Sequence, residues 1–146
     1  MGRLLGLDYG SKTTGVALTD PMQMIASPLE TIKREKEGKL RPTLRRISEL
    51  SCENEVEKII LGYPLNMDDT RGERALKTEE FKALLERRLL ADGLDIEVIL
   101  WDERLSTIDA DDVLKEAEVA AGDRKQYIDK IAAAFILEDY LKNGKR

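Results

Sequence analysis

The order of short apolar runs along the chain constrains its fold more than any other feature. Residues 4–8 and 15–19 are apolar runs on either side of Tyr9-Gly10-Ser11, a pattern that predicts a β-hairpin. A further run at 29–32 follows Pro28 and predicts a third strand. The chain therefore starts as an antiparallel meander of three strands.

Helical and strand patterns alternate after this meander. Apolar residues recur at helical spacing after Pro42 and in residues 71–90, 106–119 and 124–142, whereas 56–61 and 96–101 are typical of buried strands. Strands separated by helices pair in parallel through right-handed crossovers. We therefore expect an α/β fold with a mixed five-stranded sheet flanked by helices. A chain of 146 residues has room for one core, so we expect residues 1–142 to form a single domain and 143–146 a flexible tail.

The absence of histidine limits the chemistry that the chain can perform. With no histidine and one cysteine, a Ser-His-Asp or Cys-His site and a Cys/His zinc site are excluded. Hydrolysis would then need carboxylates with a hard cation, or a lysine or tyrosine acting alone. The sequence shows neither a signal-peptide pattern nor a long apolar run, so we expect a cytoplasmic protein without membrane spans.

The net charge of −5 argues against nucleic-acid binding. The charge is uneven, however, because residues 33–46 contain seven basic side chains and only two acidic ones, Glu35 and Glu37. This segment is either a solvated helix and loop or a local basic surface.

Three carboxylates are candidates for a catalytic metal site. Asp8 ends an apolar strand, Glu103 follows another strand, and Asp129 heads a helical stripe of small and apolar residues. Each also has a structural interpretation: Asp8 as a turn cap, Glu103 in an ion pair with Arg104, and Asp129 as a partly exposed residue beside lysines. If the three converge, their mutual repulsion requires a cation, and an all-oxygen site suits Mg²⁺ or Mn²⁺.

Two loops are candidates for substrate binding. The turn after Asp8 offers Ser11, Lys12 and Thr13 as phosphate contacts, although it is not a Walker loop and serves equally as a plain hairpin turn. The segment after the strand at 56–61 offers Asn66, with Arg71 and Arg74 at the start of the next helix. An ordinary strand-to-helix loop explains this segment equally well.

Four motifs in order resemble the YqgF (RuvX-like) family over almost the whole chain. They are Leu7-Asp8-Tyr9-Gly10-Ser11-Lys12 with Gly15-Val16-Ala17, Gly62-Tyr63-Pro64-Leu65-Asn66-Met67-Asp68, Asp102-Glu103-Arg104-Leu105-Ser106-Thr107, and Asp129-Lys130-Ile131-Ala132-Ala133. The resemblance implies a ribonuclease H-like fold and a metal-dependent nuclease whose acidic triad falls on Asp8, Glu103 and Asp129. Arg104, within the third motif, joins the predicted substrate-binding residues.

The resemblance leaves the substrate open. Members of the family are described as Holliday junction resolvases and as nucleases that trim the 5′ end of precursor 16S ribosomal RNA, and we favour the second. The rival interpretations are an ATPase or sugar-kinase-like domain and a non-catalytic RNA-binding or ribosome-assembly module. A resolvase should be a homodimer, whereas an RNA-trimming enzyme could act as a monomer. Thr13-Thr14 and Asp69 depart from the motifs of many relatives, which affects substrate grip more than the triad.

Overall fold

The structure is a computed structural model that describes residues 2–64, 71–102 and 121–144; of residues 121–127 it describes the backbone alone. Asn66, Glu103 and Arg104, together with the helix predicted at 106–119, lie outside the described residues. No helix in the described ranges is both long and apolar enough to cross a membrane.

The first half of the chain forms the predicted meander. Strand β1 (Arg3–Tyr9) pairs antiparallel with β2 (Thr13–Thr19), which pairs antiparallel with β3 (Ala26–Lys33). Strand β3 is longer than predicted and contains Pro28 instead of following it. Proline is tolerated there because β3 is an edge strand and has a neighbour on one side only.

The second half adds two parallel strands and three described helices. Helix α1 (Arg41–Glu53) leads to β4 (Val56–Tyr63), helix α2 (Glu73–Ala91) leads to β5 (Glu97–Asp102), and helix α4 (Ala121–Asn143) follows. Strand β4 lies parallel to β1, and β5 lies parallel to β4, which gives the order β3-β2-β1-β4-β5. The predicted mixed five-stranded sheet is therefore confirmed.

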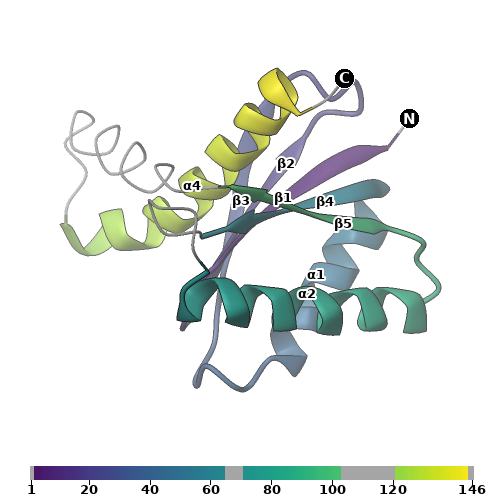
Figure 1. Ribbon diagram of the computed structural model, residues 1–146. Coiled ribbons are helices and arrows are strands. Elements are labelled where there is room, and N and C mark those ends of the chain that lie inside the picture. The colour runs from purple at the N-terminus through teal and green to yellow at the C-terminus, as the bar shows by residue number, and fades with distance from the viewer. Residues whose placement is uncertain (1, 65–70, 103–120, 145–146) are drawn as a thin grey trace.

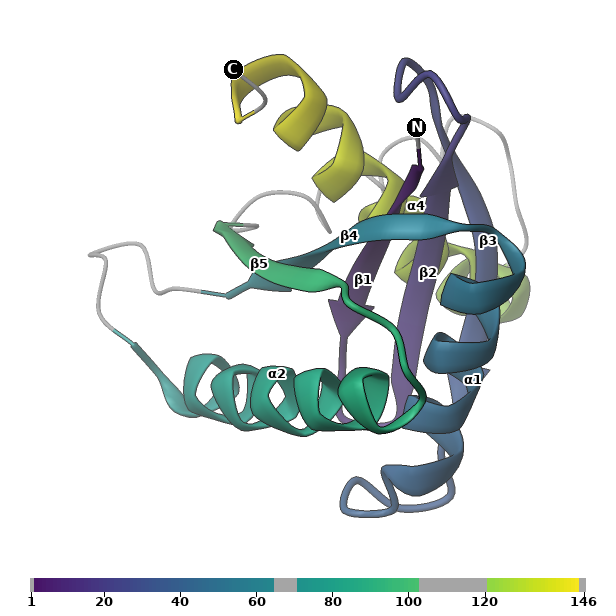
Figure 2. The same ribbon diagram turned by 90° about the vertical axis from the view of Figure 1, so that its right-hand side faces the viewer.

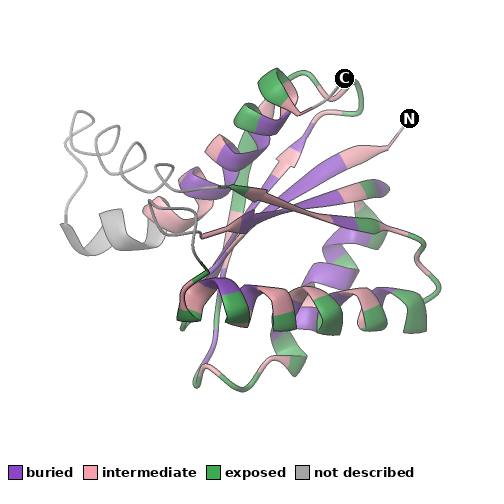
Figure 3. Cartoon of the chain, in the orientation of Figure 1, coloured by how far each residue is buried: buried purple, intermediate pink, exposed green. Residues whose placement is uncertain are grey.

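The sheet separates two layers of helices, with α1 and α2 on one face and α4 on the other (Figures 1 and 2). Alternate residues of β1 belong to different cores: Leu5 and Leu7 pack with α1 and α2, whereas Leu4 packs with α4. Figure 3 shows the buried residues along the central strands and the sheet-facing sides of the helices. Asp8 follows the alternation of Leu4 and therefore lies on the α4 face.

Helix α4 packs unusually close to the sheet because two glycines face it. A Cβ atom added to Gly6 would lie 2.8 Å from the carbonyl oxygen of Ala133, and one added to Gly15 would lie 1.8 Å from that of Asp129. The small residues predicted on this helix face, Ala132 and Ala133, are fully buried. The close approach expected from the alanines thus also depends on glycines in the strands.

Candidate active site

Asp8 and Asp129 both lie beside Gly15, at the carboxyl end of β1. In the hairpin register Asp8 is the partner of Gly15, so the two residues share the α4 face of the sheet. The backbone of Asp129 lies directly against Gly15, and the absent side chain of this glycine leaves the space that the helix occupies. Both aspartates are half-buried. The α4 face therefore carries two carboxylates beside the same turn.

Thr13 fixes the orientation of one of these carboxylates. Its hydroxyl donates a hydrogen bond of 2.6 Å to Oδ2 of Asp129, across 116 positions of the sequence. Thr13 is one of the predicted phosphate contacts, and here its side chain serves an acidic side chain of the site. A hydrogen bond to an ionised group is stronger than one between neutral groups, so this contact restricts the rotamer of Asp129.

The carboxyl ends of three parallel strands meet at this edge of the sheet. Leu7 of β1 pairs with Leu61 of β4, and Tyr63 at the end of β4 pairs with Asp102 at the end of β5. Glu103, the third predicted acid, is the next residue but lies outside the described residues. Among the described residues, which omit this glutamate, no three acidic, histidine or cysteine side chains are grouped to hold a metal ion.

The β1–β2 turn lies at the rim of the same edge. Its backbone closes through a hydrogen bond of 2.8 Å from the Gly10 amide to the Thr13 carbonyl. The side chains of Ser11 and Lys12 are exposed, as a contact to an external phosphate requires.

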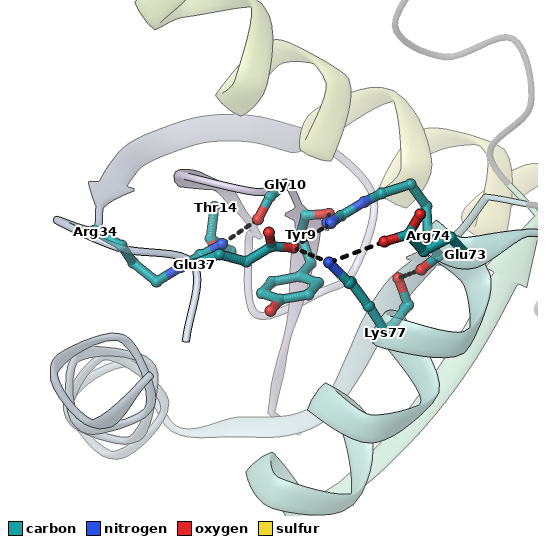
Figure 4. A network of polar contacts seen from close by, with 9 residues as sticks. Tyr9, Gly10, Thr14, Arg34, Glu37, Glu73, Arg74 and Lys77 are labelled. Atoms are coloured by element: carbon teal, nitrogen blue, oxygen red, sulfur yellow. Dashed lines mark hydrogen bonds and ion pairs between the residues drawn. The ribbon is translucent and has the colours of Figure 1, made fainter. Parts of the chain in front are cut away.

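A polar network on the opposite face of the sheet holds this turn from below (Figure 4). The buried guanidinium of Arg34 donates to the carbonyl of Gly10 and, at 3.0 Å, to Oγ1 of Thr14. Its carbon Cζ lies 4.8 Å from the centre of the Tyr9 ring, which stacks on Phe81 at 4.1 Å. Burial lowers the pKa of Arg34, although a guanidinium stays protonated. Arg34 therefore anchors the residues that follow Asp8.

Glu37 connects this network to α2. Its Oε1 lies 2.7 Å from Arg74 and 3.0 Å from Lys77. The hydrogen bond from Lys77 has the larger effect on the pKa of Glu37, and together with the one from Arg74 it holds that pKa below its ordinary value. Arg74 also donates to the carbonyl of Tyr9 at 3.2 Å. Arg74, predicted as a phosphate contact, is thus engaged within the protein and supports the residue next to Asp8.

Arg71, another predicted phosphate contact, is paired too. Its Nη1 lies 3.2 Å from Glu79, which also accepts a hydrogen bond of 2.6 Å from the Tyr63 hydroxyl. The hydrogen bond from Tyr63 and, to a smaller extent, the charge of Arg71 lower the pKa of Glu79. The same hydrogen bond to Glu79 raises the pKa of Tyr63. The Arg71 side chain is largely exposed, so a phosphate would compete with Glu79 for it.

Sequence reasoning missed Arg34 and Glu37 as supports of the site. Each acts on residues twenty or more positions away, and both lie in a segment that stands out in the sequence only for its charge. A basic residue at the end of an edge strand, beside a predicted hairpin turn, is the one indication that was available for Arg34.

Comparison with solved structures defines the class of fold. The RuvC of T. thermophilus in complex with Holliday junction substrate superposes with a TM-score of 0.55 at 16% identity, over 99% of this chain and 97% of that one. The fowlpox virus Holliday junction resolvase gives 0.52 at 15% identity, over 98% and 99% of the two chains. The chain thus has a ribonuclease H-like fold.

Sequence comparison defines the family. The family model "RuvX: Holliday junction resolvase" matches residues 2–143, and the chain belongs to this family. A relative from Lachnospira eligens is 51% identical over 144 residues, 99% of each chain, and one from Agathobacter rectalis is 47% identical over 146 residues, 98% of this chain and 99% of the other. Both bear the name "Putative pre-16S rRNA nuclease". The resemblance inferred from the four motifs is confirmed.

Proposed function

We propose that the protein is a metal-dependent nuclease that hydrolyses phosphodiester bonds and processes the 5′ end of precursor 16S ribosomal RNA. Membership of the family and the names of two relatives near 50% identity support the substrate. The observation that carries the chemistry is the hydrogen bond from Thr13 to Asp129, on the face and at the edge that Asp8 occupies. Asp8, Asp129 and Glu103 are the proposed catalytic residues.

The available donors fit a hard divalent cation. Two half-buried carboxylates on one face repel each other unless a positive charge lies between them, and a chain without histidine offers oxygen ligands. Asp8, Asp129 and Glu103 would hold Mg²⁺ or Mn²⁺, which when bound supplies positive charge to the reacting phosphate. Thr13 orients Asp129, while Ser11 and Lys12 bind a neighbouring phosphate. Asn66, Arg71 and Arg104 are further proposed substrate contacts.

Cleavage of branched DNA is the second candidate function. The description of the matching family model names a Holliday junction resolvase, and two solved resolvases share the fold. The structural likeness, at 16% identity and below, concerns the fold alone. A resolvase cuts two strands symmetrically, so this function also predicts a homodimer, whereas RNA trimming is compatible with a monomer.

A side-by-side cleavage assay tests both functions. Purified protein is incubated with precursor 16S RNA or with a four-way DNA junction, each with Mg²⁺, with Mn²⁺ and with a chelator. We expect cleavage of the RNA that requires the metal and is abolished by Asp8→Asn. Asp95→Asn is the matched control, because this exposed residue precedes β5 at the opposite edge of the sheet.

Three results would contradict the proposal or its choice of substrate. Cleavage that survives Asp8→Asn would remove the acidic site from the mechanism. Wild-type protein that cuts neither substrate, while an Asp8→Asn gene still supports ribosome maturation in cells, would favour a non-catalytic RNA-binding module. Preferential cutting of the junction by a dimer would favour the resolvase.

A further inference from the structure

Lys33 is placed beside the acidic edge by the register of the sheet. It is the last residue of β3, and its partner in β2 is Thr13. Residues paired in this way project from the same face, and the hydroxyl of Thr13 is bonded to Asp129 on that face. Lys33 thus lies on the α4 face, two strand spacings or about 10 Å across the sheet from β1, and two residues or about 7 Å along the strands from the level of Asp8.

Two further lysines are near Lys33. One is linked to the neighbouring residue by a backbone hydrogen bond, and the other follows three positions later in the sequence. The carbonyl of Lys12 accepts a hydrogen bond of 2.7 Å from the amide of Arg34, which ties the β1–β2 turn to the residue after Lys33. Lys36 follows in the next loop. All three side chains are exposed. We refer to Lys12, Lys33 and Lys36 as the lysine rim.

Several cations near the lysine rim are paired with acidic side chains, whereas within the described part of the chain the members of the rim are not. Lys39 is paired with Glu35, Arg46 with Glu30, and Arg74 and Lys77 with Glu37. Within residues 2–64, 71–102 and 121–144, no ion pair involves a member of the rim. Of the exposed cations of the 33–46 segment without an ion pair in these ranges, Lys33 lies level with Thr13 of the turn that follows Asp8, whereas Arg41 and Arg45 lie on α1, on the other face of the sheet.

Such a local surplus is what an acidic protein needs in order to bind a polyanion. The net charge of −5 repels nucleic acid at long range, so affinity must come from a few unpaired cations in contact with phosphates. A surface hollow of about 320 Å³ continues away from the rim, lined by Lys33, Arg34, Glu35, Lys39 and Pro42. This hollow offers a nucleic-acid strand a path over the β3 side of the molecule.

We propose that the lysine rim binds the sugar-phosphate backbone of the substrate. The bound nucleic-acid strand would then run away from the acidic edge, across β2 and β3. Lys33 is the central positioning residue, since it stands level with the carboxylate that Thr13 holds. This proposal rests on the proposed nuclease function for its substrate class, but the binding that it describes can be measured without cleavage.

Binding of a fluorescein-labelled single-stranded RNA, taken from the 5′ leader of precursor 16S RNA, tests the rim. Fluorescence anisotropy is measured across a KCl series with Asp8→Asn protein, so that the RNA stays intact. For each lost phosphate contact, the slope of log Kobs against log salt should fall by about 0.7. Lys33→Gln should therefore weaken binding roughly 5- to 10-fold at about 50 mM salt, and Lys33→Gln with Lys36→Gln should lower the slope by about 1.4.

Lys142→Gln is the matched control. It removes the same charge from an exposed position on α4, thirteen residues after Asp129 and therefore about 20 Å further along the helix. It should leave affinity and salt slope unchanged. Lys33→Arg, which keeps the positive charge that Lys33→Gln removes, should have the affinity and salt slope of the protein with Lys33. In cleavage assays with Asp8 present, Lys33→Gln should raise KM and leave kcat near wild type.

The outcomes separate this proposal from the proposed function. If Lys33→Gln and Lys142→Gln bind RNA equally well, or if the Asp8→Asn protein does not bind the RNA, the rim is not the binding surface even when wild type cleaves. If binding depends on Lys33 but wild type cuts nothing, the rim is upheld and the nuclease function is overturned. The Tm of each variant is also measured. A variant whose Tm equals that of wild type has kept its fold, so weaker RNA binding by that variant is due to the lost charge.

Discussion

The contact between α4 and Gly15 offers the most direct perturbation of the site. In Gly15→Ala the new Cβ would lie 1.8 Å from the carbonyl oxygen of Asp129, 2.2 Å from its carbonyl carbon and 2.8 Å from the amide nitrogen of Lys130. Ordinary contact starts at 3.4 Å, so the strand and the helix must separate by about 1.6 Å. The obstacle is helix backbone, which cannot rotate aside as a side chain can.

The expected effects on stability and on activity differ in size. Overpacking of this kind costs about 1–3 kcal/mol of the free energy of unfolding, which leaves a folded protein. Activity should suffer more, because the displaced segment carries Asp129 away from Asp8, and a misplacement of about 1 Å at a reacting centre costs on the order of 100-fold in rate. We therefore expect folded Gly15→Ala protein with cleavage lowered about 100-fold.

Urea unfolding and RNA cleavage in Mg²⁺ measure the two effects on the same preparation. Gly38→Ala is the control, since no atom lies within 4 Å of its added Cβ and its backbone needs no left-handed conformation. It should match wild type in both assays. Gly15→Ala with unchanged stability would refute the close packing of α4, and lowered stability with full cleavage would refute the dependence of the chemistry on the position of Asp129.

Two further changes test supports of the site, and a third tests the β2–β3 turn at the other end of the sheet. Thr13→Val removes the hydrogen bond to Asp129 and should lower kcat about 10-fold, whereas Thr13→Ser should keep most of the activity in the same cleavage assay. Arg34→Lys cannot serve both acceptors of the buried guanidinium and should lower the free energy of unfolding by about 2 kcal/mol in urea titrations, unlike exposed Arg45→Lys. Backbone amides of Ile25 and Met24 lower the pKa of Asp20, so its carboxylate stabilises the fold above its unfolded pKa of about 3.9. The difference in Tm between wild type and Asp20→Ala should therefore be full at neutral pH and shrink as the pH falls through that range; a constant difference would contradict this origin.

The strands of this fold are readable from the sequence because their signals are local. Residues 4–8 and 15–19 are uniform apolar runs bounded by turn residues, and the structure extends each by no more than two residues at either end. The third strand was predicted too short because Pro28 and the exposed Leu29 interrupt the pattern. An edge strand tolerates both, but its position at the edge is known only once all five strands are ordered.

The site divides in the same way between local and distant information. Asp129 could be singled out because small residues follow it at helical spacing, and that spacing describes its own helix alone. Its partner Thr13 is 116 residues away and was expected to bind a phosphate. The pairing of Arg74 with Glu37 likewise depends on the packing of α2 against the loop before α1, so a local pattern could only suggest a free arginine.

The two faces of the sheet have different tasks at this edge. On one face, Arg34 and Arg74 hold the carbonyls of Gly10 and Tyr9, so the end of β1 is fixed by contacts that do not face α4. On the other face, Gly15 and Thr13 fix the helix that brings Asp129. The position of Asp8 relative to Asp129 therefore depends on both cores at once, because each carboxylate is anchored from a different layer. A change in either layer should alter the distance between the carboxylates before it unfolds the protein, since the five-stranded sheet holds both layers together.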